Sequence, residues 1–200
     1  RAILRASVLG DVRLMFPLVS TLLELRQAKM VLADVMEDLD EAGVKFNRKL
    51  PVGMMVEVPS AVLLIDHFVE EVDFVSIGTN DLTQYAMAAD RLASDLAHLT
   101  DPWQPAVLQL IHVTAAAGQR AGKPVGVCGE AAADPHLAVA LVGMGITSLS
   151  MAPAAVRAVG AQLCAVSTDT CRRAAEVALA AADPMAGREA VRATLPGHHT

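Results

Sequence analysis

Short apolar runs alternate along the chain with longer segments of helical periodicity. The strand-length runs fall at residues 13–19, 52–56, 74–77, 125–127 and 148–151. Each is followed by a loop and then by a segment with helical character, in several of which apolar residues recur every three or four positions. Strands that alternate with helices over short connections predict an α/β fold with a parallel sheet of five strands.

Capping residues mark the ends of the predicted helices. Thr21 and Glu24 fit a capping box at the start of one helix, and Gly43 is expected to end it. Further helices are predicted around residues 61–69 and 82–89.

The second half of the chain carries the same kind of signal. Pro105 suits the first position of a helix that Gly122 closes, and Asp134 followed by Pro135 suits the start of another. One helix is predicted after Pro153, and two more helical segments complete the pattern.

The side chains with the most chemical capability stand just after strands. Glu57 follows the strand at 52–56, Asp81 follows the next strand after a Gly-Thr-Asn turn, and Cys128 follows the strand at 125–127. In parallel α/β folds, sites form where strands end, either at the top of a barrel or at the switch point of an open sheet. The pattern therefore predicts an active site at this edge of the sheet.

The number of strands is smaller than a closed barrel requires. An eight-stranded (β/α)₈ barrel typically needs about 250 residues, and the chain has 200. If the fold is a barrel of this type, only its C-terminal part is expected here, with roughly the first three strand–helix units missing. The chain begins at Arg1 without an initiator methionine, and we expect it to be cut from a longer protein.

Composition narrows the class of protein. Apolar residues make up 54% of the chain and charged residues 19%, which indicates a globular domain with a substantial core. A net charge of −6 and only 3% aromatic residues argue against a nucleic-acid binder. The three cysteines show no paired spacing, which favours a reducing, cytoplasmic location, and no apolar run is long enough to predict a membrane span.

Glu57 and Asp81 form a candidate metal site. They are predicted at the ends of successive strands, and adjacent strands lie about 4.8 Å apart. Mg²⁺ is commonly held by one or two carboxylates, several waters and a phosphate or carboxylate of the substrate. The alternative is that Asp81 caps a helix and Glu57 is a surface charge.

Four further residues are candidates for binding an anion. Gly78, Thr79 and Asn80 offer backbone N–H groups at a helix N-terminus, where anions bind readily, although an ordinary helix cap has the same sequence. Arg91 follows the next short helix and could bind a phosphate or carboxylate with both arms of its guanidinium, or be a solvated surface arginine.

Cys128 stands between apolar and glycine residues. Gly126 and Gly129 permit close approach of backbone or ligand. The thiol could be a nucleophile, but no histidine lies near it in sequence to act as a base. A neutral thiol, whose ordinary pKa is about 8.5, could instead donate a proton. The remaining alternative is a buried structural cysteine.

Four motifs lie in fixed order, at residues 54–59, at residues 74–85 with Asp90 and Arg91, at residues 127–130 and at residues 149–153. Together they resemble a known family, Enzyme I of the bacterial sugar phosphotransferase system. The resemblance runs from residue 1 to about residue 165. The related dikinase and phosphoenolpyruvate synthase share parts of these motifs, but residues 76–85 and 149–151 are most similar to Enzyme I.

The resemblance implies a (β/α)₈ barrel that binds phosphoenolpyruvate and Mg²⁺ at its C-terminal face. By motif position, it implies that Glu57 and Asp81 ligate Mg²⁺. It implies that Asn80 and the turn before it hold the phosphate, together with Arg91. It also implies that Cys128 protonates C3 of the enolate after the phosphoryl group has left, so that pyruvate is released.

The resemblance further implies partners and domains outside this sequence. In the family, the phosphoryl group passes to a histidine on a separate N-terminal domain and then to a histidine-containing phosphocarrier protein, and the barrel domain forms a homodimer. None of the six histidines matches that motif, so the phosphohistidine and carrier-binding domains are expected to be absent. Residues 1–168 are expected to be the C-terminal portion of the barrel domain, 169–195 its last helices and 196–200 a tail, and this chain alone is not expected to turn over.

Two alternative functions stay open at this point. The first is an enzyme like pyruvate phosphate dikinase or phosphoenolpyruvate synthase, which would carry a nucleotide-binding domain instead of a carrier-binding one. The second is a non-catalytic module for ligand binding and dimerisation. The set of Glu57, Asp81, Arg91 and Cys128 argues against the second, since a pure scaffold has no physical need for all four groups.

Overall fold

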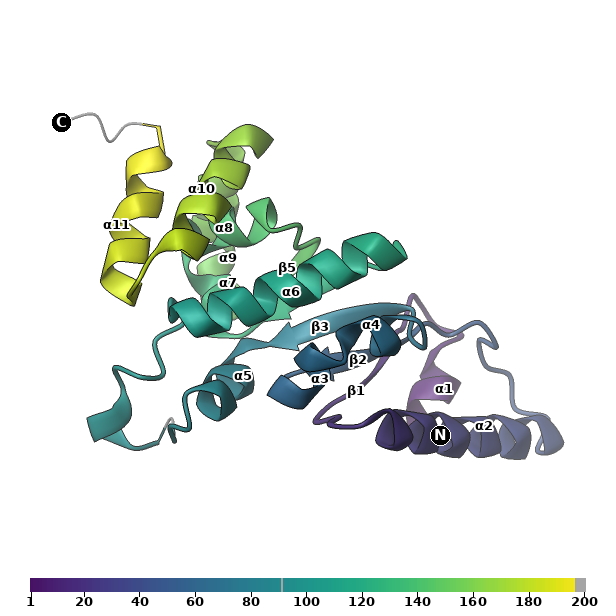
Figure 1. Ribbon diagram of the computed structural model, residues 1–200. Coiled ribbons are helices and arrows are strands. Elements are labelled where there is room, and N and C mark those ends of the chain that lie inside the picture. Colours follow the sequence, from purple (N-terminus) through teal and green to yellow (C-terminus); the bar gives the residue numbers. More distant parts are fainter. Residues whose placement is uncertain (91, 197–200) are drawn as a thin grey trace.

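A computed structural model describes residues 1–90 and 92–196. Five strands form one parallel sheet in the order β1-β2-β3-β4-β5 (Figure 1). This confirms the parallel α/β sheet that the sequence predicts. The strands are β1 (Leu14–Phe16), β2 (Val52–Val56), β3 (Phe74–Gly78), β4 (Val125–Cys128) and β5 (Ser148–Ser150).

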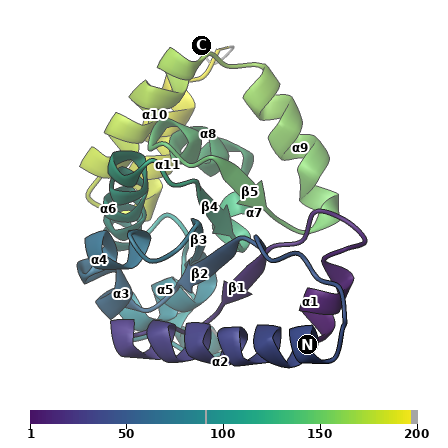
Figure 2. The same ribbon diagram turned by 90° about the vertical axis from the view of Figure 1, so that its right-hand side faces the viewer.

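The strand order is that of a barrel rather than of a doubly wound sheet. Each strand pairs in parallel with the strand that follows it in the chain, and the order never reverses. Right-handed crossovers then place the connecting helices on a single face of the sheet. Figure 2 shows helices α2, α4, α6 and α8 arranged around the outside of a curved sheet. The fold is therefore the partial barrel that we expected.

The helices have the following bounds. They are α1 (Ala2–Ala6), α2 (Leu22–Glu41), α3 (Pro59–Leu63), α4 (Ile65–Val69), α5 (Thr79–Ala86), α6 (Pro105–Ala121), α7 (Glu130–Ala133), α8 (Pro135–Gly143), α9 (Pro153–Cys164), α10 (Thr168–Ala180) and α11 (Pro184–Thr194), with a 3₁₀ turn, η1, at Ser94–Leu96.

The predicted helix ends are confirmed where a cap defines them. Thr21 and Glu24 make both hydrogen bonds of the capping box of α2. Gly122 ends α6 with a φ of 65°, in the left-handed region that favours glycine. The side chain of Asp134 accepts hydrogen bonds from the N–H groups of His136 and Leu137 at the start of α8.

Two predicted helices differ from the structure. The helix expected at residues 61–69 is two short helices, α3 and α4, because Leu64 between them leaves the helical region, with a φ of −110° and a ψ of 20°. The helix expected at 82–89 already begins at Thr79 and ends at Ala86. The first turn of α5 consists of polar residues, Thr79, Asn80 and Asp81. Residues of these types lower helix propensity inside a helix but are favourable in its first turn, so the helix starts earlier than predicted. The short helices α1 and α7 and the turn η1 were not predicted.

The two faces of the sheet have different environments. On the outer face, alternating residues such as Met54, Val56 and Ile77 are fully buried in the main core under the helices. On the inner face, small and large residues alternate between neighbouring strands. A side chain at Gly53 would collide with the ring of Phe74, so the glycine leaves room for its neighbour.

Helix α8 packs closely against α10. The contact depends on Gly143, the last residue of α8, because a Cβ atom there would overlap the backbone carbonyl of Cys171. Gly160 in α9 is the opposite case, since a Cβ atom at that position has no neighbour within 4 Å.

The same substitution at these two helical glycines should have opposite effects on stability. We expect Gly143→Ala to lower the free energy of unfolding by about 1–3 kcal/mol, because backbone must shift to admit the methyl group. We expect Gly160→Ala to raise it by about 0.5–1 kcal/mol, since alanine loses less backbone entropy in a helix. Urea unfolding followed by circular dichroism measures both, and a stabilising Gly143→Ala would contradict the packing described.

Candidate functional site

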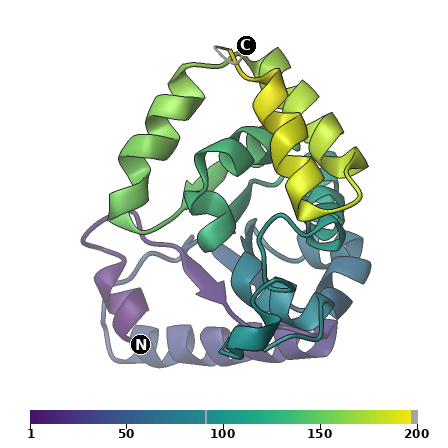
Figure 3. The ribbon, with the colours of Figure 1, turned by 90° about the vertical axis from the view of Figure 1, so that its left-hand side faces the viewer.

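The predicted site residues gather where strands β2, β3 and β4 end. Figure 3 looks onto this side of the molecule, where α5, α7 and the segments around them lie. In the sheet, Val56 pairs with Ile77 and Gly78 pairs with Cys128. Glu57 therefore comes directly beside Gly78, and a Cβ atom at Gly78 would lie only 2.7 Å from Oε2 of Glu57. The glycine at the end of β3 leaves the space that this carboxyl group occupies.

Glu57 is buried and bonded to backbone. The residue is only 3% exposed, so the alternative of a surface charge is wrong. Oε1 accepts a hydrogen bond of 2.7 Å from the N–H of Leu18, in the loop after β1. Leu18 has a φ of 51°, which is uncommon for a residue other than glycine. Sequence reasoning missed this contact, because nothing in the pattern marks a backbone N–H as a partner.

Glu57 and Asp81 act on each other electrostatically. Burial raises the pKa of Glu57 above its ordinary value of 4.5, and the N–H of Leu18 opposes this change. The charge of Asp81 and a hydrogen bond between the two side chains raise the pKa of Glu57 further. The anionic form of Glu57 is therefore destabilised, and a cation at this position would stabilise it.

Asp81 lies in the first turn of α5 but does not cap it. The N-cap is Gly78, and α5 has no side-chain capping bond. The capping alternative for Asp81 is therefore wrong. The N-terminus of a helix carries a partial positive charge, which interacts favourably with a carboxylate in the first turn. The position of Asp81 therefore tolerates its negative charge.

Thr79 and Asn80 join the end of β3 to the end of β4. The Thr79 hydroxyl donates a 2.8 Å hydrogen bond to the carbonyl of Cys128, and Oδ1 of Asn80 accepts one of 3.2 Å from the N–H of Glu130. Gly129 lies between these bonds with a φ of 102°, and a Cβ atom there would lie 2.7 Å from Oδ1 of Asn80. These contacts fix the two strand ends against each other.

Cys128 is half-buried and carries a proton at neutral pH. Its Sγ donates a 3.4 Å hydrogen bond to the carbonyl of Ile77. Burial raises the pKa of the Cys128 thiol, a side-chain bond with Ser76 lowers it by less, and the charges of Glu57 and Asp81 raise it again. The geometry therefore favours a neutral proton donor over a thiolate nucleophile. Sequence reasoning did not single out Ser76.

A cavity of about 390 Å³ opens beside Asn80 and Glu130, which follow β3 and β4, whereas Glu57, Asp81 and Cys128 are not among the residues that line it. It is lined by Asn80, Leu92, Thr100 and Glu130, and its size suits a small ligand. A cavity of about 440 Å³ lies elsewhere, beside Phe46, so volume alone does not identify the site. What distinguishes the first cavity is that Asn80 and Glu130, which follow the ends of β3 and β4, line it. Arg91 lies outside the residues that the structure describes, and the next residue along the chain, Leu92, lines the cavity.

The oxygen atoms here suit a hard cation with few protein ligands. In residues 1–90 and 92–196 there is no group of three or more His, Cys, Asp or Glu side chains that could hold a metal ion. A pair of carboxylates matches an ion that keeps water or substrate oxygens in its remaining positions.

Within residues 1–90 and 92–196, no helix is long and apolar enough to cross a membrane.

Comparison with known proteins gives one family. The family model described as "PEP-utilising enzyme, PEP-binding domain", where PEP is phosphoenolpyruvate, matches residues 1–168. A phosphoenolpyruvate-protein phosphotransferase from Geobacillus stearothermophilus is 45% identical over 179 residues, which are 90% of this chain and 31% of the relative. Another from Latilactobacillus sakei is 49% identical over 156 residues, 78% of this chain and 27% of the relative. The chain thus spans about a third of the length of these relatives or less.

Solved structures share the fold at low sequence identity. A citrate lyase from Burkholderia xenovorans LB400 aligns with a TM-score of 0.59 and 20% identity, over 98% of this chain and 66% of that one. RipC from Yersinia pestis aligns with a TM-score of 0.54 and 12% identity, over 84% of this chain and 70% of that one. At these identities the likeness shows the fold alone.

The buried charge of Glu57 should make stability depend on pH. The pKa of Glu57 is higher in the folded than in the unfolded chain, so its burial costs nothing below the ordinary value and destabilises the fold above the raised one. We expect Glu57→Gln, which keeps an acceptor for Leu18, to raise the free energy of unfolding at about pH 7 and to leave it unchanged at about pH 4. Urea unfolding at both pH values measures this, and the same substitution at the exposed Glu37 is the control, which should show no such pH-dependent gain in stability. A variant less stable than the wild type at neutral pH would show that the charge of Glu57 is stabilising.

The protonated thiol of Cys128 should react slowly. Alkylation requires a thiolate, and burial both raises the pKa of Cys128 and limits access. At neutral pH we expect iodoacetamide to modify Cys128 about tenfold more slowly than the exposed Cys164, with buried Cys171 as the protected control. Peptide mapping by mass spectrometry gives the three rates. Faster reaction at Cys128 than at Cys164 would instead indicate an activated nucleophile.

Proposed function

Because the chain belongs to the PEP-utilising enzyme family and matches its PEP-binding domain, we propose that it binds phosphoenolpyruvate and Mg²⁺ at the ends of β2, β3 and β4. The whole protein is proposed to be a phosphoenolpyruvate–protein phosphotransferase, the name that its curated relatives carry. The observation that carries the proposal is the buried carboxyl group of Glu57 held against the half-buried Asp81, beside a helix N-terminus.

Glu57 and Asp81 are the proposed ligands of Mg²⁺. Their donor atoms are oxygens only, which suit Mg²⁺ better than a softer metal. Burial is the main cause of the raised pKa of Glu57 and the charge of Asp81 adds to it, and a divalent cation would stabilise the carboxylate against both. When bound, Mg²⁺ would neutralise negative charge on the phosphate and on the carboxylate pair.

The start of α5 is the proposed phosphate site. Gly78 is the N-cap, so the backbone N–H groups of Thr79 and Asn80 lie in the first turn, at the positive end of the helix dipole. The side chain of Asn80 uses Oδ1 for the N–H of Glu130, which leaves its donor nitrogen on the other side of the amide group. Arg91 is proposed to add a charged contact with the phosphate.

Cys128 is proposed to complete the reaction as an acid. Loss of the phosphoryl group leaves the enolate of pyruvate, which must gain a proton on C3. A half-buried thiol with a raised pKa keeps its proton at neutral pH, and the cavity lies at the same strand ends. The charges of Glu57 and Asp81 disfavour the thiolate that remains, so it takes up a proton from solvent and the neutral thiol is restored.

The later steps are proposals about the whole protein. The phosphoryl group would pass to a histidine on a separate N-terminal domain and then to a histidine-containing phosphocarrier protein of a sugar transport system in the cytoplasm. A homodimer of this domain is part of the same proposal, as is its division into residues 1–168, the helices of 169–195 and a tail. The names of the relatives favour this function over a dikinase or a synthase.

Calorimetric titration of phosphoenolpyruvate into the chain tests the site. We expect binding that requires Mg²⁺ and that Asp81→Asn weakens about tenfold or more, since a charged ligand atom is lost. Cys128→Ala is the matched control, because a proton donor to the product should leave the affinity within about twofold of the wild type. Binding that is equal without Mg²⁺, or equal in Asp81→Asn, would contradict the proposed ligands. A folded chain that binds nothing would contradict the proposal that these strand ends suffice.

A further inference from the structure

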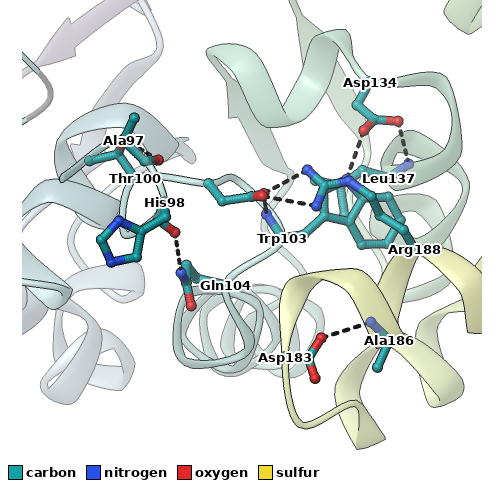
Figure 4. Close-up of polar contacts among 11 residues, drawn as sticks. Ala97, His98, Thr100, Trp103, Gln104, Asp134, Leu137, Asp183, Ala186 and Arg188 are labelled. Carbon is teal, nitrogen blue, oxygen red and sulfur yellow. Dashed lines mark hydrogen bonds and ion pairs between the residues drawn. The ribbon is translucent and has the colours of Figure 1, made fainter. Parts of the chain in front are cut away.

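A polar cluster around a buried tryptophan lies next to the proposed substrate cavity. Trp103 is the only tryptophan of the chain and is 1% exposed. It lies in the segment between α5 and α6, and its neighbours come from the start of α8 and from α11. Figure 4 shows the side chains of Asp134 and Arg188 beside the ring of Trp103.

Asp134 connects Trp103 to the helix after β4. The indole N–H of Trp103 donates a 2.7 Å hydrogen bond to Oδ2 of Asp134. The other oxygen, Oδ1, accepts bonds of 2.9 and 3.1 Å from the N–H groups of His136 and Leu137. Both oxygens of Asp134 are thus engaged, one in capping α8 and one in holding the tryptophan.

Arg188 connects the same segment to α11. Its two terminal nitrogens donate to the two oxygens of Asp101, at 2.9 and 2.7 Å. Oδ1 of Asp101 also accepts a 2.9 Å hydrogen bond from the backbone N–H of Trp103. The guanidinium lies 5.5 Å from the centre of the Trp103 ring, within range of a cation–π contact. A fork of two bonds combined with stacking fixes orientation as well as distance, which a lysine cannot do.

The residues held by this cluster are neighbours of two cavity walls. Asp101 directly follows Thr100, and Asp134 directly follows α7, whose first residue is Glu130. Thr100 and Glu130 both line the cavity. Helix α7 is therefore fixed at both ends, by Asn80 at the N–H of Glu130 and by Trp103 at Asp134.

We propose that Arg188 and Trp103 are positioning residues for the phosphoenolpyruvate site, and that through them α11 sets the separation of the walls that carry Thr100 and Glu130. The statement about substrate rests on the proposed function, whereas the statement about the walls rests on the contacts alone. Helix α11 lies beyond residue 168, where the match to the family model ends. The positioning role therefore belongs to a part of the chain outside the matched domain.

Hydrogen exchange on the full chain tests the mechanical part without any ligand. We expect Arg188→Gln to speed amide exchange about three- to tenfold in residues 92–104 and 128–134, because local opening of both walls becomes easier. Exchange in α2 and in strands β2 and β3 should stay unchanged. The exchange rates of Arg188→Lys should fall between those of the wild type and those of Arg188→Gln. If Arg188→Gln does not fold, Arg188→Lys is compared with the wild type in its place.

Arg120→Gln is the matched control. It breaks another ion pair between an arginine and an aspartate, the 2.6 Å contact of Arg120 with Asp66, which joins α6 to α4 away from the cavity. This control should leave both walls at the wild-type exchange rate. Unchanged exchange at the walls in Arg188→Gln, or an equal increase over the whole chain, would overturn the positioning role.

Titration of phosphoenolpyruvate with Mg²⁺ into the same variants separates the two proposals. We expect Arg188→Gln to weaken the affinity about three- to tenfold and Arg120→Gln to leave it unchanged. If the wild type binds and Arg188→Gln binds equally well, the positioning of the substrate site is wrong although the proposed function stands. If the wild type itself does not bind, the proposed function and the substrate part of this inference both fail, and the exchange rates still decide whether α11 holds the walls.

Discussion

Each strand of the sheet pairs with the strand that follows it in the chain, and the rest of the structure depends on this constraint. A parallel order without reversal places the connecting helices on one face and brings successive strand ends together at one edge. Glu57, Asp81 and Cys128 come from three different strand–helix units, separated by up to 71 positions in the chain. They meet because the loops that carry them all begin at the same edge of the sheet, where the parallel strands end.

At that edge, small residues and cross-strand hydrogen bonds determine what the strand ends can hold. Gly78 makes room for the carboxyl group of Glu57, and Thr79 donates a hydrogen bond to the strand that carries Cys128. The result is a buried carboxyl group, Glu57, held against the half-buried Asp81 and next to a protonated thiol. Burying the carboxylate of Glu57 beside Asp81 lowers stability. A cation and an anionic ligand bound at this site would offset that cost.

The sequence was sufficient to predict the contacts that follow from periodicity and chain order. Alternating strands and helices predict the parallel sheet, and the position of Glu57 and Asp81 after successive strands predicts their meeting. It was not sufficient for contacts between irregular segments. The backbone N–H of Leu18 that binds Glu57 has no side-chain signature, and Arg188 bonds a residue 87 positions away that no periodic pattern links to it. The break at Leu64 was likewise invisible, because the apolar pattern continues through it.

The central claim is that the ends of β2 and β3 bind a divalent cation and phosphoenolpyruvate together. A crystal structure of the chain grown with phosphoenolpyruvate and Mn²⁺, which takes the same oxygen ligands and scatters anomalously, tests this most directly. The account predicts one anomalous peak between the carboxyl groups of Glu57 and Asp81, with the phosphate against the first turn of α5. A peak elsewhere, or phosphoenolpyruvate bound away from this edge of the sheet, would contradict it.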